Sequence, residues 1–432
     1  MKTAALIASL TLVMSLADDT LALGAGVEVE DTGGRPSGRK TIITSPGVYK
    51  AEVWQAAGGG IMKFYDLAAD PEAKLNLAGY DRGLFEVGWH GAGRKDADES
   101  KGDYISGKHQ SYGCRDWPSM GHGKLKVEGE LEVIEKSPAR IRVRAKSVFT
   151  FWSRFADKNM PVTGIYTFYP TGKIAIQVRV QKREREFRWS GEYGPHLFLI
   201  SNKTKDGKIV GFNHGTPRYP DYGKDTKGMW PRPAAEELSF AYSTTGIKTT
   251  FFITIPPEQH KVFNRHMRHY FPGHWDRFGY GSGGVLMSPG YDATWACMIQ
   301  MGTPGSKLVP DIKTAKDAVP YAMQYREPAK LTGPDGIGIT DDEGDLNKDG
   351  YNESEGCHVL KGPGPLSFTY EKGKGAGFAP VFKVTGWKGD APKTVQVDGK
   401  ETACVATVVD GKLIVQVMGT ILGGKVQVDI GK

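Results

Sequence analysis

Strict alternation of apolar and polar residues is the feature that most limits the folds open to this chain. In KIAIQVRVQ, residues 173–181, isoleucine or valine occupies every second position, and RIRVRAKS, residues 140–147, alternates arginine or lysine with other residues. A period of two is typical of a strand in an antiparallel sheet with one buried face. Pro170 and Gly172 lie between two such runs, so a hairpin turn is predicted there. These patterns predict an all-β protein.

The C-terminal part of the chain repeats the pattern with shorter strands. Asp-Gly pairs at 398–399 and 410–411 and a Gly-Gly pair at 423–424 separate its alternating runs, as hairpin turns do. A link rich in proline and glycine, EPAKLTGPDGIG at 327–338, comes before it. We predict a large antiparallel sheet domain over residues 25–330. Residues 331–432 are predicted to form a linker with an acidic loop and a small C-terminal β-sandwich.

The first residues, MKTAALIASLTLVMSLADD, have the order of a secretory signal. Lys2 supplies the positive start, residues 4–14 are apolar, and Ser15-Leu16-Ala17 offers a cleavage site of small residues. We predict a signal peptide at 1–24, a secreted or periplasmic protein, and no membrane partner, because no later segment is long and apolar enough to span a bilayer. The four cysteines are compatible with one or two disulfides or with four thiols.

The charge of the chain is unevenly distributed. Its 56 Lys and Arg and 49 Asp and Glu give a formal net charge of +7. Residues 136–188 hold 13 basic and three acidic residues, a local charge of +10. In an exported protein a basic face favours anionic glycans over nucleic acid, and a solvated strand face is the alternative. We therefore expect an acidic polysaccharide or oligosaccharide as partner and no nucleic acid, with the oligomeric state open.

Three stretches of the large domain resemble a known family. GGGIMKFYDL at 58–67, LNLAGYDRGLFEVGWHG at 75–91 and the FYPTGKIAI hairpin at 168–176 are similar to galactose-mutarotase-like super-β-sandwiches. The sheet domain of many secreted polysaccharide lyases resembles the same scaffold, and a smaller β-sandwich can follow in both groups. The resemblance implies a large antiparallel super-β-sandwich that acts on carbohydrates. A fold alone does not assign catalytic residues.

Residues 335–355 form an acidic stretch in this basic chain, with eight Asp or Glu and one Lys, a local charge of −7. Oxygen-bearing side chains at alternate positions, with Gly350 sixth, match the start of an EF-hand-like calcium loop. The match ends at the twelfth position, which is Gly356 instead of Glu. A solvated acidic linker is the alternative. The predicted ligands of a structural Ca²⁺ are Asp345, Asn347, Asp349, the backbone carbonyl of Tyr351, and Glu353, with Glu355 as another closing ligand.

The segment NRHMRHYFPGHWDRFGYGSGG, residues 264–284, is dense in histidine, arginine and tyrosine. A lyase that removes the C5 proton of a uronic acid needs a positive group for the carboxylate and a base for the proton. Arginine or histidine suits the first task, and tyrosine or histidine suits the second. A basic aromatic strip without chemistry is one alternative, and a metal site of His266, His269 and His274 is another. The catalytic candidates in this segment are His269, Tyr270, Arg277 and Tyr280.

Three further histidines complete the set of catalytic candidates. His109 lies in GKHQSYGCRDWPSMGHG, residues 107–123, whose glycines and aromatic rings suit a loop over a sugar cleft. His90 in GWHG and His196 in YGPHLFL stand beside predicted strands. Both can face the same groove, or both can be packed core histidines.

The sequence predicts a secreted carbohydrate-active enzyme, a polysaccharide lyase that cleaves an acidic, uronic-acid glycan by β-elimination. A non-catalytic glycan-binding or surface protein is one alternative. A glycoside hydrolase is the other, and it needs two carboxylates at a defined separation. Nothing in the sequence pairs the available candidates, which are Glu86, Glu192, Asp276 and Asp292.

Overall fold

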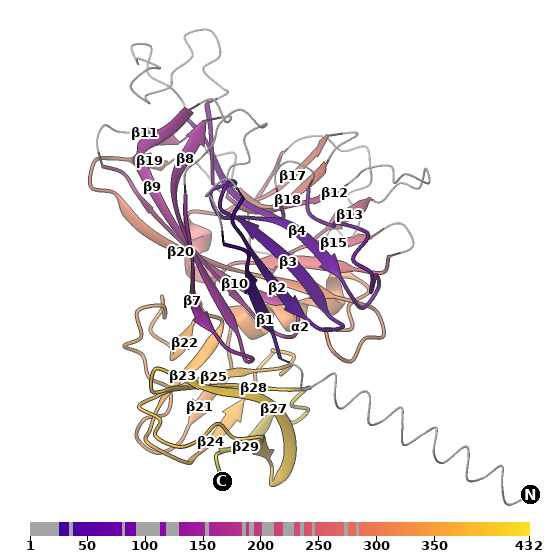
Figure 1. Ribbon diagram of the computed structural model, residues 1–432, viewed down its shortest axis with the longest axis vertical. Helices are drawn as coiled ribbons and strands as arrows, with labels where there is room; N and C mark the ends of the chain where they lie inside the picture. Colours follow the sequence, from indigo (N-terminus) through magenta and orange to yellow (C-terminus); the bar gives the residue numbers. More distant parts are fainter. Residues whose placement is uncertain are drawn as a thin grey trace, which may run out of the picture.

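The computed structural model (Figure 1) describes most of the chain. The described residues are 26–33, 38–79, 83–91, 113–117, 129–151, 155–183, 187–189, 194–200, 211–218, 229–233, 237–243, 247–271, 275–281 and 285–432. The predicted signal peptide at 1–24 and the candidate His109 lie outside these residues. Within them, no helix has the length and apolar character needed to cross a membrane.

A four-stranded antiparallel sheet comes first in the described part of the chain, in the order β1-β2-β3-β4. Its strands are β1 (Glu28–Asp31), β2 (Lys40–Ser45), β3 (Tyr49–Trp54) and β4 (Gly60–Asp66). The burial of β2 alternates strictly between buried and half-buried residues, as its period of two requires. Its buried side therefore faces a second layer.

That layer is a large sheet with 16 strands in the described residues, whose main order is β13-β15-β16-β20-β10-β9-β8-β6-β5-β12-β18-β17-β14. Its strands are β5 (Phe85–Gly91), β6 (Gly113–Trp117), β7 (Glu130–Lys136), β8 (Ile141–Phe151), β9 (Phe155–Phe168), β10 (Lys173–Gln181), β11 (Phe187–Trp189), β12 (Pro195–Ile200), β13 (Phe212–Gly215), β14 (Met229–Pro233), β15 (Ser239–Ser243), β16 (Thr250–Thr254), β17 (Arg265–Phe271), β18 (Trp275–Gly281), β19 (Val285–Met287) and β20 (Asp292–Gly302).

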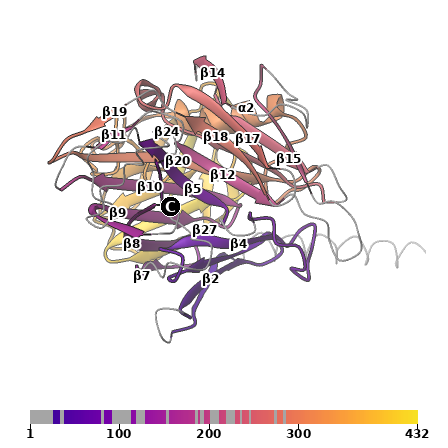
Figure 2. The same cartoon turned by 90° about the horizontal axis from the view of Figure 1, so that it is seen from above.

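The main core fills the space between these two sheets. Figures 1 and 2 show the four-stranded sheet lying against one face of the large sheet. Ile43 and Phe64 from the first sheet and Ile176 and Phe251 from the second belong to one buried apolar cluster. Phe64 and Phe251 meet edge to face, with ring centroids 5.6 Å apart. Burial of this apolar surface supplies the main driving force for folding.

The C-terminal sheet lies at one end of the molecule (Figure 1), has nine strands in the order β21-β24-β29-β26-β27-β28-β25-β23-β22, and encloses its own core. Asp398 and Asp410 have φ values of 49° and 50°, and the glycines that follow them 72° and 69°, so both Asp-Gly pairs form the predicted hairpin turns. The strands are β21 (Lys330–Thr332), β22 (Tyr351–Asn352), β23 (Cys357–Lys361), β24 (Leu366–Glu371), β25 (Val381–Thr385), β26 (Thr394–Val397), β27 (Lys400–Val409), β28 (Lys412–Val417) and β29 (Lys425–Ile430).

Helical structure is sparse, so the predicted all-β fold class is confirmed. In the described part of the chain, the α-helix is α2 (Ala315–Arg326), which begins with a capping box between Thr314 and Asp317. It covers the outer side of β15 and β16. Residues 256–271 form the 3₁₀ turn η2 (Pro257–Lys261) followed by β17, which pairs with β18. Cys297, Cys357 and Cys404 are free thiols.

Candidate functional site

The hairpin of β17 and β18 carries four of the predicted catalytic positions. His269 is paired with Arg277, Tyr270 with Asp276, and His266 with Tyr280. The structure describes His269, Tyr270 and Arg277 through this backbone pairing. A three-residue step such as 266 to 269 brings two positions together on a helix, but in a strand it separates them onto opposite faces. The spacing that favoured a histidine metal site is therefore not realised in β17.

Tyr280 lies in the core. Its side chain is fully buried in the main apolar cluster, and its Oη is 3.4 Å from the carbonyl oxygen of Glu237. Burial raises the pKa of its hydroxyl above the usual value, so the phenolate is disfavoured. This placement differs from the expected position in a sugar groove. Tyr280 is held there by packing, which includes an edge-to-face contact with His260.

His196 is the catalytic candidate whose surroundings are described most fully. It lies on β12 directly opposite Glu86 of β5, and both side chains are buried. Its Nδ1 is 2.5 Å from the carbonyl oxygen of Gly194. A carbonyl oxygen only accepts hydrogen bonds, so Nδ1 carries a proton, and Nε2 of the neutral ring is the acceptor. The hydrogen bond to Gly194 therefore fixes the tautomer of His196.

The second ring nitrogen of His196 faces a carboxylate. Nε2 is 3.9 Å from Oε1 of Glu86, and both side chains are at most 1% exposed. An imidazole lone pair and a carboxylate repel each other unless a proton lies on one of them. At 3.9 Å the two atoms are beyond hydrogen-bond distance, so the two groups form an ion pair only when the imidazole is protonated.

Strand register places the hairpin candidates beside this pair. His196 is paired with Gly279 of β18, and Phe198 with Arg277, which in turn is paired with His269 of β17. Leu197, between His196 and Phe198, belongs to the main core. Because side chains alternate along a strand, positions 277 and 269 belong to the set that contains His196 and Glu86, on the face away from the core.

His90 belongs to the same strand as Glu86. It is paired with Cys114 of β6, four residues along β5 from Glu86, and is described by its backbone alone. An even step along a strand keeps two positions on one face. The register thus brings the positions of His90, His196, His269 and Arg277 onto one face of the large sheet. The positions of Tyr270 and Tyr280 belong to the opposite face.

Two glycines allow the strands to approach one another around His196. Gly279 has a φ of +149°, and a Cβ atom there would lie 2.6 Å from both Cα and Cβ of His196. At Gly194 a Cβ atom would lie 2.6 Å from the carbonyl oxygen of Tyr280. Contacts this short are not tolerated, so glycine is needed at both positions.

The acidic loop folds around one carboxylate. Asp345 is buried, and its Oδ1 accepts hydrogen bonds from the backbone N–H of Lys348 at 2.7 Å and of Asp349 at 3.2 Å. Its Oδ2 accepts one from Gly350 at 2.8 Å. Gly350 has a φ of +88°, and its Cβ position would lie 3.1 Å from the backbone of Gly338. The predicted sharp turn is therefore present at the predicted glycine.

Three of the predicted calcium ligands converge in this loop. The carboxylates of Asp345, Asp349 and Glu353 offer oxygens that all lie within 4.8 Å of one another. Two oxygens bound to one calcium at about 2.4 Å are at most about 4.8 Å apart, so the three can share an ion. Burial, and then the charges of Asp349 and Asp345, raise the pKa of Glu353 to about 8. A cation would relieve this repulsion.

The other predicted ligands lie close by in different roles. Asn347 Nδ2 donates to Asp349 Oδ2 at 3.1 Å and to Glu258 Oε1 at 3.2 Å. Tyr351 donates its backbone N–H to Asp349 Oδ1 at 2.8 Å. Glu355 points elsewhere: burial opposes its ionisation, but Arg140, Arg142 and Lys383 hold its pKa below the usual range.

Two of these relationships escaped sequence reasoning. Glu86 was considered only as a carboxylate for hydrolysis, and its meeting with His196 depends on the pairing of β5 with β12. Arg140 was one arginine in an alternating run, yet it is 1% exposed and binds Glu355 across 215 residues. A basic residue in the turn between two strands was the one signal available for it.

Comparison with known proteins gives structural neighbours and no sequence match. No family model and no curated protein matches the chain. Similar solved structures include a putative aldose 1-epimerase from Klebsiella pneumoniae subsp. pneumoniae, with a TM-score of 0.38, 10% identity and coverage of 64% of this chain and 83% of that one. A putative mutarotase from Salmonella typhimurium has a TM-score of 0.34, 10% identity and coverage of 66% and 99%.

A heparan sulfate lyase from Pedobacter heparinus is also similar, with a TM-score of 0.28, 8% identity and coverage of 64% of this chain and 35% of that one. These neighbours belong to the two groups that the sequence resembles, which are mutarotase-like epimerases and polysaccharide lyases. The fold class rests on the strand pairing of this chain, since each of these TM-scores is below 0.5.

Proposed function

We propose that this chain is an exported carbohydrate-active enzyme, a polysaccharide lyase that cleaves an acidic, uronic-acid glycan by β-elimination. One observation carries the proposal: the buried Glu86–His196 pair lies on the sheet face to which the register also assigns positions 269 and 277. This combines a buried histidine–carboxylate pair with neighbouring positions held by histidine and arginine. The basic run at 136–188 supports an acidic substrate.

In this reaction the C5 proton is transferred to a base, the C4–O4 bond breaks, and a double bond forms between C4 and C5. His196 has the tautomer that leaves Nε2 ready to accept a proton, and Glu86 stabilises the imidazolium that forms. Arg277 and His269 are the proposed partners of the substrate carboxylate, whose charge grows in the transition state. His90, whose position lies on the same face, is the proposed acid that protonates the leaving O4, with His109 as a further candidate, whereas the position of Tyr270 belongs to the opposite face.

A hydrolase is less well supported by the described carboxylates. Glu86 on β5 is engaged with His196, and Asp292 at the start of β20 binds Arg179 at 2.6 Å. Both carboxylates are therefore already engaged by another side chain, and neither is placed as the general acid that glycoside hydrolysis needs.

The experiment is to incubate the mature chain with alginate, pectin, heparin-type and ulvan-type polymers and to follow ultraviolet absorbance. A lyase produces unsaturated ends that absorb, whereas a hydrolase yields reducing ends without that signal. A glycan-binding protein without activity is retarded in an affinity gel that contains the polymer, and it yields neither unsaturated ends nor reducing ends. Absence of absorbance with every uronate polymer, together with unchanged polymer length, contradicts the proposal.

We also propose that Asp345, Asp349 and Glu353, with the backbone carbonyl of Tyr351 and the side chain of Asn347, hold a structural Ca²⁺. Support comes from the convergence of the three carboxylates, two of them buried, around the turn at Gly350. Hard oxygen ligands in this arrangement suit calcium better than a redox metal. Calcium titration of the chelator-treated chain by calorimetry tests it, and no heat above that of dilution contradicts it.

A further inference from the structure

We propose that residues 342–356, which we call the acidic loop, form a cation-dependent lock between the large sheet and the nine-stranded sheet. Loading of the cation site and docking of the two sheets stabilise each other in this lock. The inference rests on the cation site proposed above. It adds that cation binding at this site is coupled to the contact between the large sheet and the nine-stranded sheet.

The large sheet holds the acidic loop through its hairpin turns. Arg140, between β7 and β8, is 1% exposed, and its Nη1 lies 2.7 Å from Oε2 of Glu355. Tyr169, after β9, donates from Oη to the carbonyl oxygen of Glu355 at 2.5 Å. Lys173, at the start of β10, donates from Nζ to the carbonyl oxygen of Gly356 at 2.8 Å. All of these groups are buried, so they exchange water for one another when the sheets dock.

The nine-stranded sheet holds the same loop from the other side. Lys383 of β25 lies 3.2 Å from Oε1 of Glu355 and 2.7 Å from Oδ2 of Asp342, with its side chain 6% exposed. Glu355 thus stands between Arg140 of one sheet and Lys383 of the other. A buried carboxylate between two cations keeps a favourable energy only while both remain in place.

A single turn connects this ion network to the cation site. Asn352 accepts a hydrogen bond on its carbonyl oxygen from Gly356 N at 2.7 Å and one on Oδ1 from Glu355 N at 2.7 Å. Glu353, the next residue, points its carboxylate into the cation site, while its carbonyl oxygen accepts a bond from Tyr325 of α2 at 3.0 Å. Glu353 and Glu355 are therefore held in one hydrogen-bonded turn.

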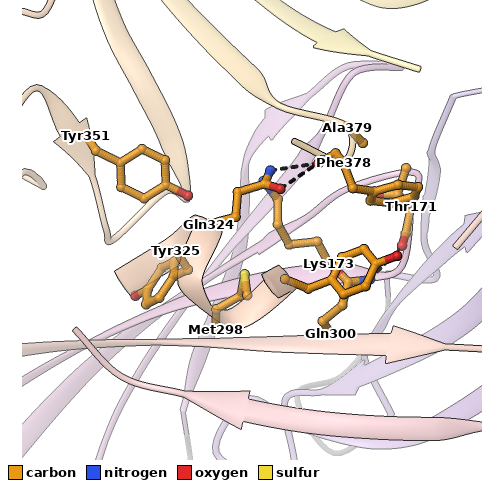
Figure 3. Close-up of a pocket in the computed structure, with 10 residues that line it drawn as sticks. Thr171, Lys173, Met298, Gln300, Gln324, Tyr325, Tyr351, Phe378 and Ala379 are labelled. Atoms are coloured by element: carbon orange, nitrogen blue, oxygen red, sulfur yellow. Dashed lines mark hydrogen bonds between the residues drawn. The ribbon is translucent and has the colours of Figure 1, made fainter. Parts of the chain in front are cut away.

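The interface beside this turn is closely packed and polar. Figure 3 shows Gln324 of α2 bound to the segment before β25, donating from Nε2 to the carbonyl oxygen of Phe378 at 2.7 Å and accepting from its N–H at 2.9 Å. Lys173 and Tyr351 line the same small cavity of about 20 Å³, room for about one water molecule. The large sheet, α2 and the nine-stranded sheet thus meet around the acidic loop.

Thermodynamic linkage turns this geometry into a measurable claim. If the cation binds more tightly when the sheets are docked, docking is favoured by the same factor when the cation is bound. Couplings of this kind typically lie between about 5-fold and 150-fold. A change in the ion network must therefore alter cation affinity, although Glu355, Arg140 and Tyr169 supply no ligand to the cation.

The experiment measures the Ca²⁺ dissociation constant of the full mature chain by calorimetry, for the wild type, Glu355→Gln and Tyr169→Phe. Tyr169→Phe keeps the ring and removes only the hydroxyl that binds the acidic loop, so we expect it to fold even if Glu355→Gln does not. Tyr49→Phe is the matched control, because Tyr49 is also fully buried and its Oη has no hydrogen-bond partner. Melting temperatures with and without Ca²⁺ are recorded for each protein.

We expect Tyr169→Phe to weaken Ca²⁺ binding several-fold, Glu355→Gln to weaken it at least about 10-fold, and Tyr49→Phe to leave it unchanged. The stabilisation by Ca²⁺ should shrink in step with the loss of affinity. Unchanged Ca²⁺ affinity in Tyr169→Phe, with a lowered melting temperature, overturns the lock and leaves the cation site standing. No Ca²⁺ binding by the wild type overturns the cation site and the lock together.

Discussion

His196 Nε2 and Glu86 Oε1 lie 3.9 Å apart across one register pair of β12 and β5, with both side chains buried. The opposite ring nitrogen of His196 is tied to the carbonyl oxygen of Gly194. A ring anchored at one nitrogen, with the other directed toward a carboxylate, is held in one orientation. The proposed lyase chemistry depends on this relationship.

Replacing His196 tests that dependence directly. General acid–base groups contribute about 100-fold to 10,000-fold to rates, so His196→Gln should lower kcat/KM on the active polymer by roughly 100-fold or more. Glu86→Gln should lower it less and shift the pH profile, because the imidazolium loses its counter-charge. Initial rates of ultraviolet absorbance measure both.

The matched control for this prediction is His214→Gln. His214 is also buried, but it packs against Phe278 in the core, with ring centroids 5.1 Å apart. His214→Gln should lower the free energy of unfolding and leave kcat/KM within a few-fold of the wild type. Equal losses of activity in His196→Gln and His214→Gln would show that packing, not proton transfer, explains the result.

Gly279 should be intolerant of any side chain. In Gly279→Ala the new Cβ would lie 2.6 Å from His196, so β12 or β18 must shift and the His196–Glu86 geometry must change. We expect a loss of roughly 3 kcal/mol in the free energy of unfolding, combining backbone strain and overpacking. Urea unfolding measures it.

Gly290→Ala separates these two costs. Gly290 also has a positive φ, +86°, but nothing lies within 4 Å of its Cβ position. It should lose only about 1 kcal/mol through backbone strain. If Gly279→Ala is no worse than Gly290→Ala, the close approach at His196 is unimportant.

Chelation should destabilise the chain through the acidic loop. At a free Ca²⁺ concentration 100 times the dissociation constant, binding contributes about 2.7 kcal/mol, so a chelator should lower the melting temperature by several degrees. Asp345→Ala should abolish that sensitivity. Asp341→Ala, an exposed carboxylate outside the predicted ligand set, should preserve it. A chelator response that persists in Asp345→Ala would place the ion elsewhere.

Acid should destabilise the fold partly through His260. Burial, and then the neighbouring Arg326 guanidinium, lower the pKa of His260 to about 4 from an unfolded value near 6.5. Below pH 6.5 the unfolded chain therefore binds a proton that the folded chain does not. The free energy of unfolding then decreases as the pH is lowered from about 6.5 to about 4. After allowance for partial exposure, His260 should account for roughly 2 kcal/mol of that loss.

The measurement compares urea unfolding of the wild type and His260→Gln between pH 7 and 4. Glutamine retains an acceptor for Arg326, whose Nη1 lies 2.7 Å from His260 Nε2. The stability difference should change in favour of the variant as pH falls. Parallel pH dependences of the two proteins would contradict the assigned pKa.

The sequence by itself determined the all-β class, the hairpin turns and the shape of the acidic loop. Alternation with a period of two selects strands, and Asp-Gly pairs select tight turns, because both act through backbone geometry within a few residues. The spacing of Asp345, Asp349 and Glu353 around Gly350 likewise brings their oxygens together by local chain geometry. These features are set before any distant contact forms.

Only the tertiary structure decided which distant residues meet. Tyr280 and Arg277 stand three positions apart in one candidate segment, yet Tyr280 is in the core and position 277 belongs to the opposite face. Glu355 stands beside predicted calcium ligands but binds Arg140 of the other sheet. Which strands become neighbours, and which face each one buries, is settled by the packing of the whole sheet, and a local pattern holds no information about it.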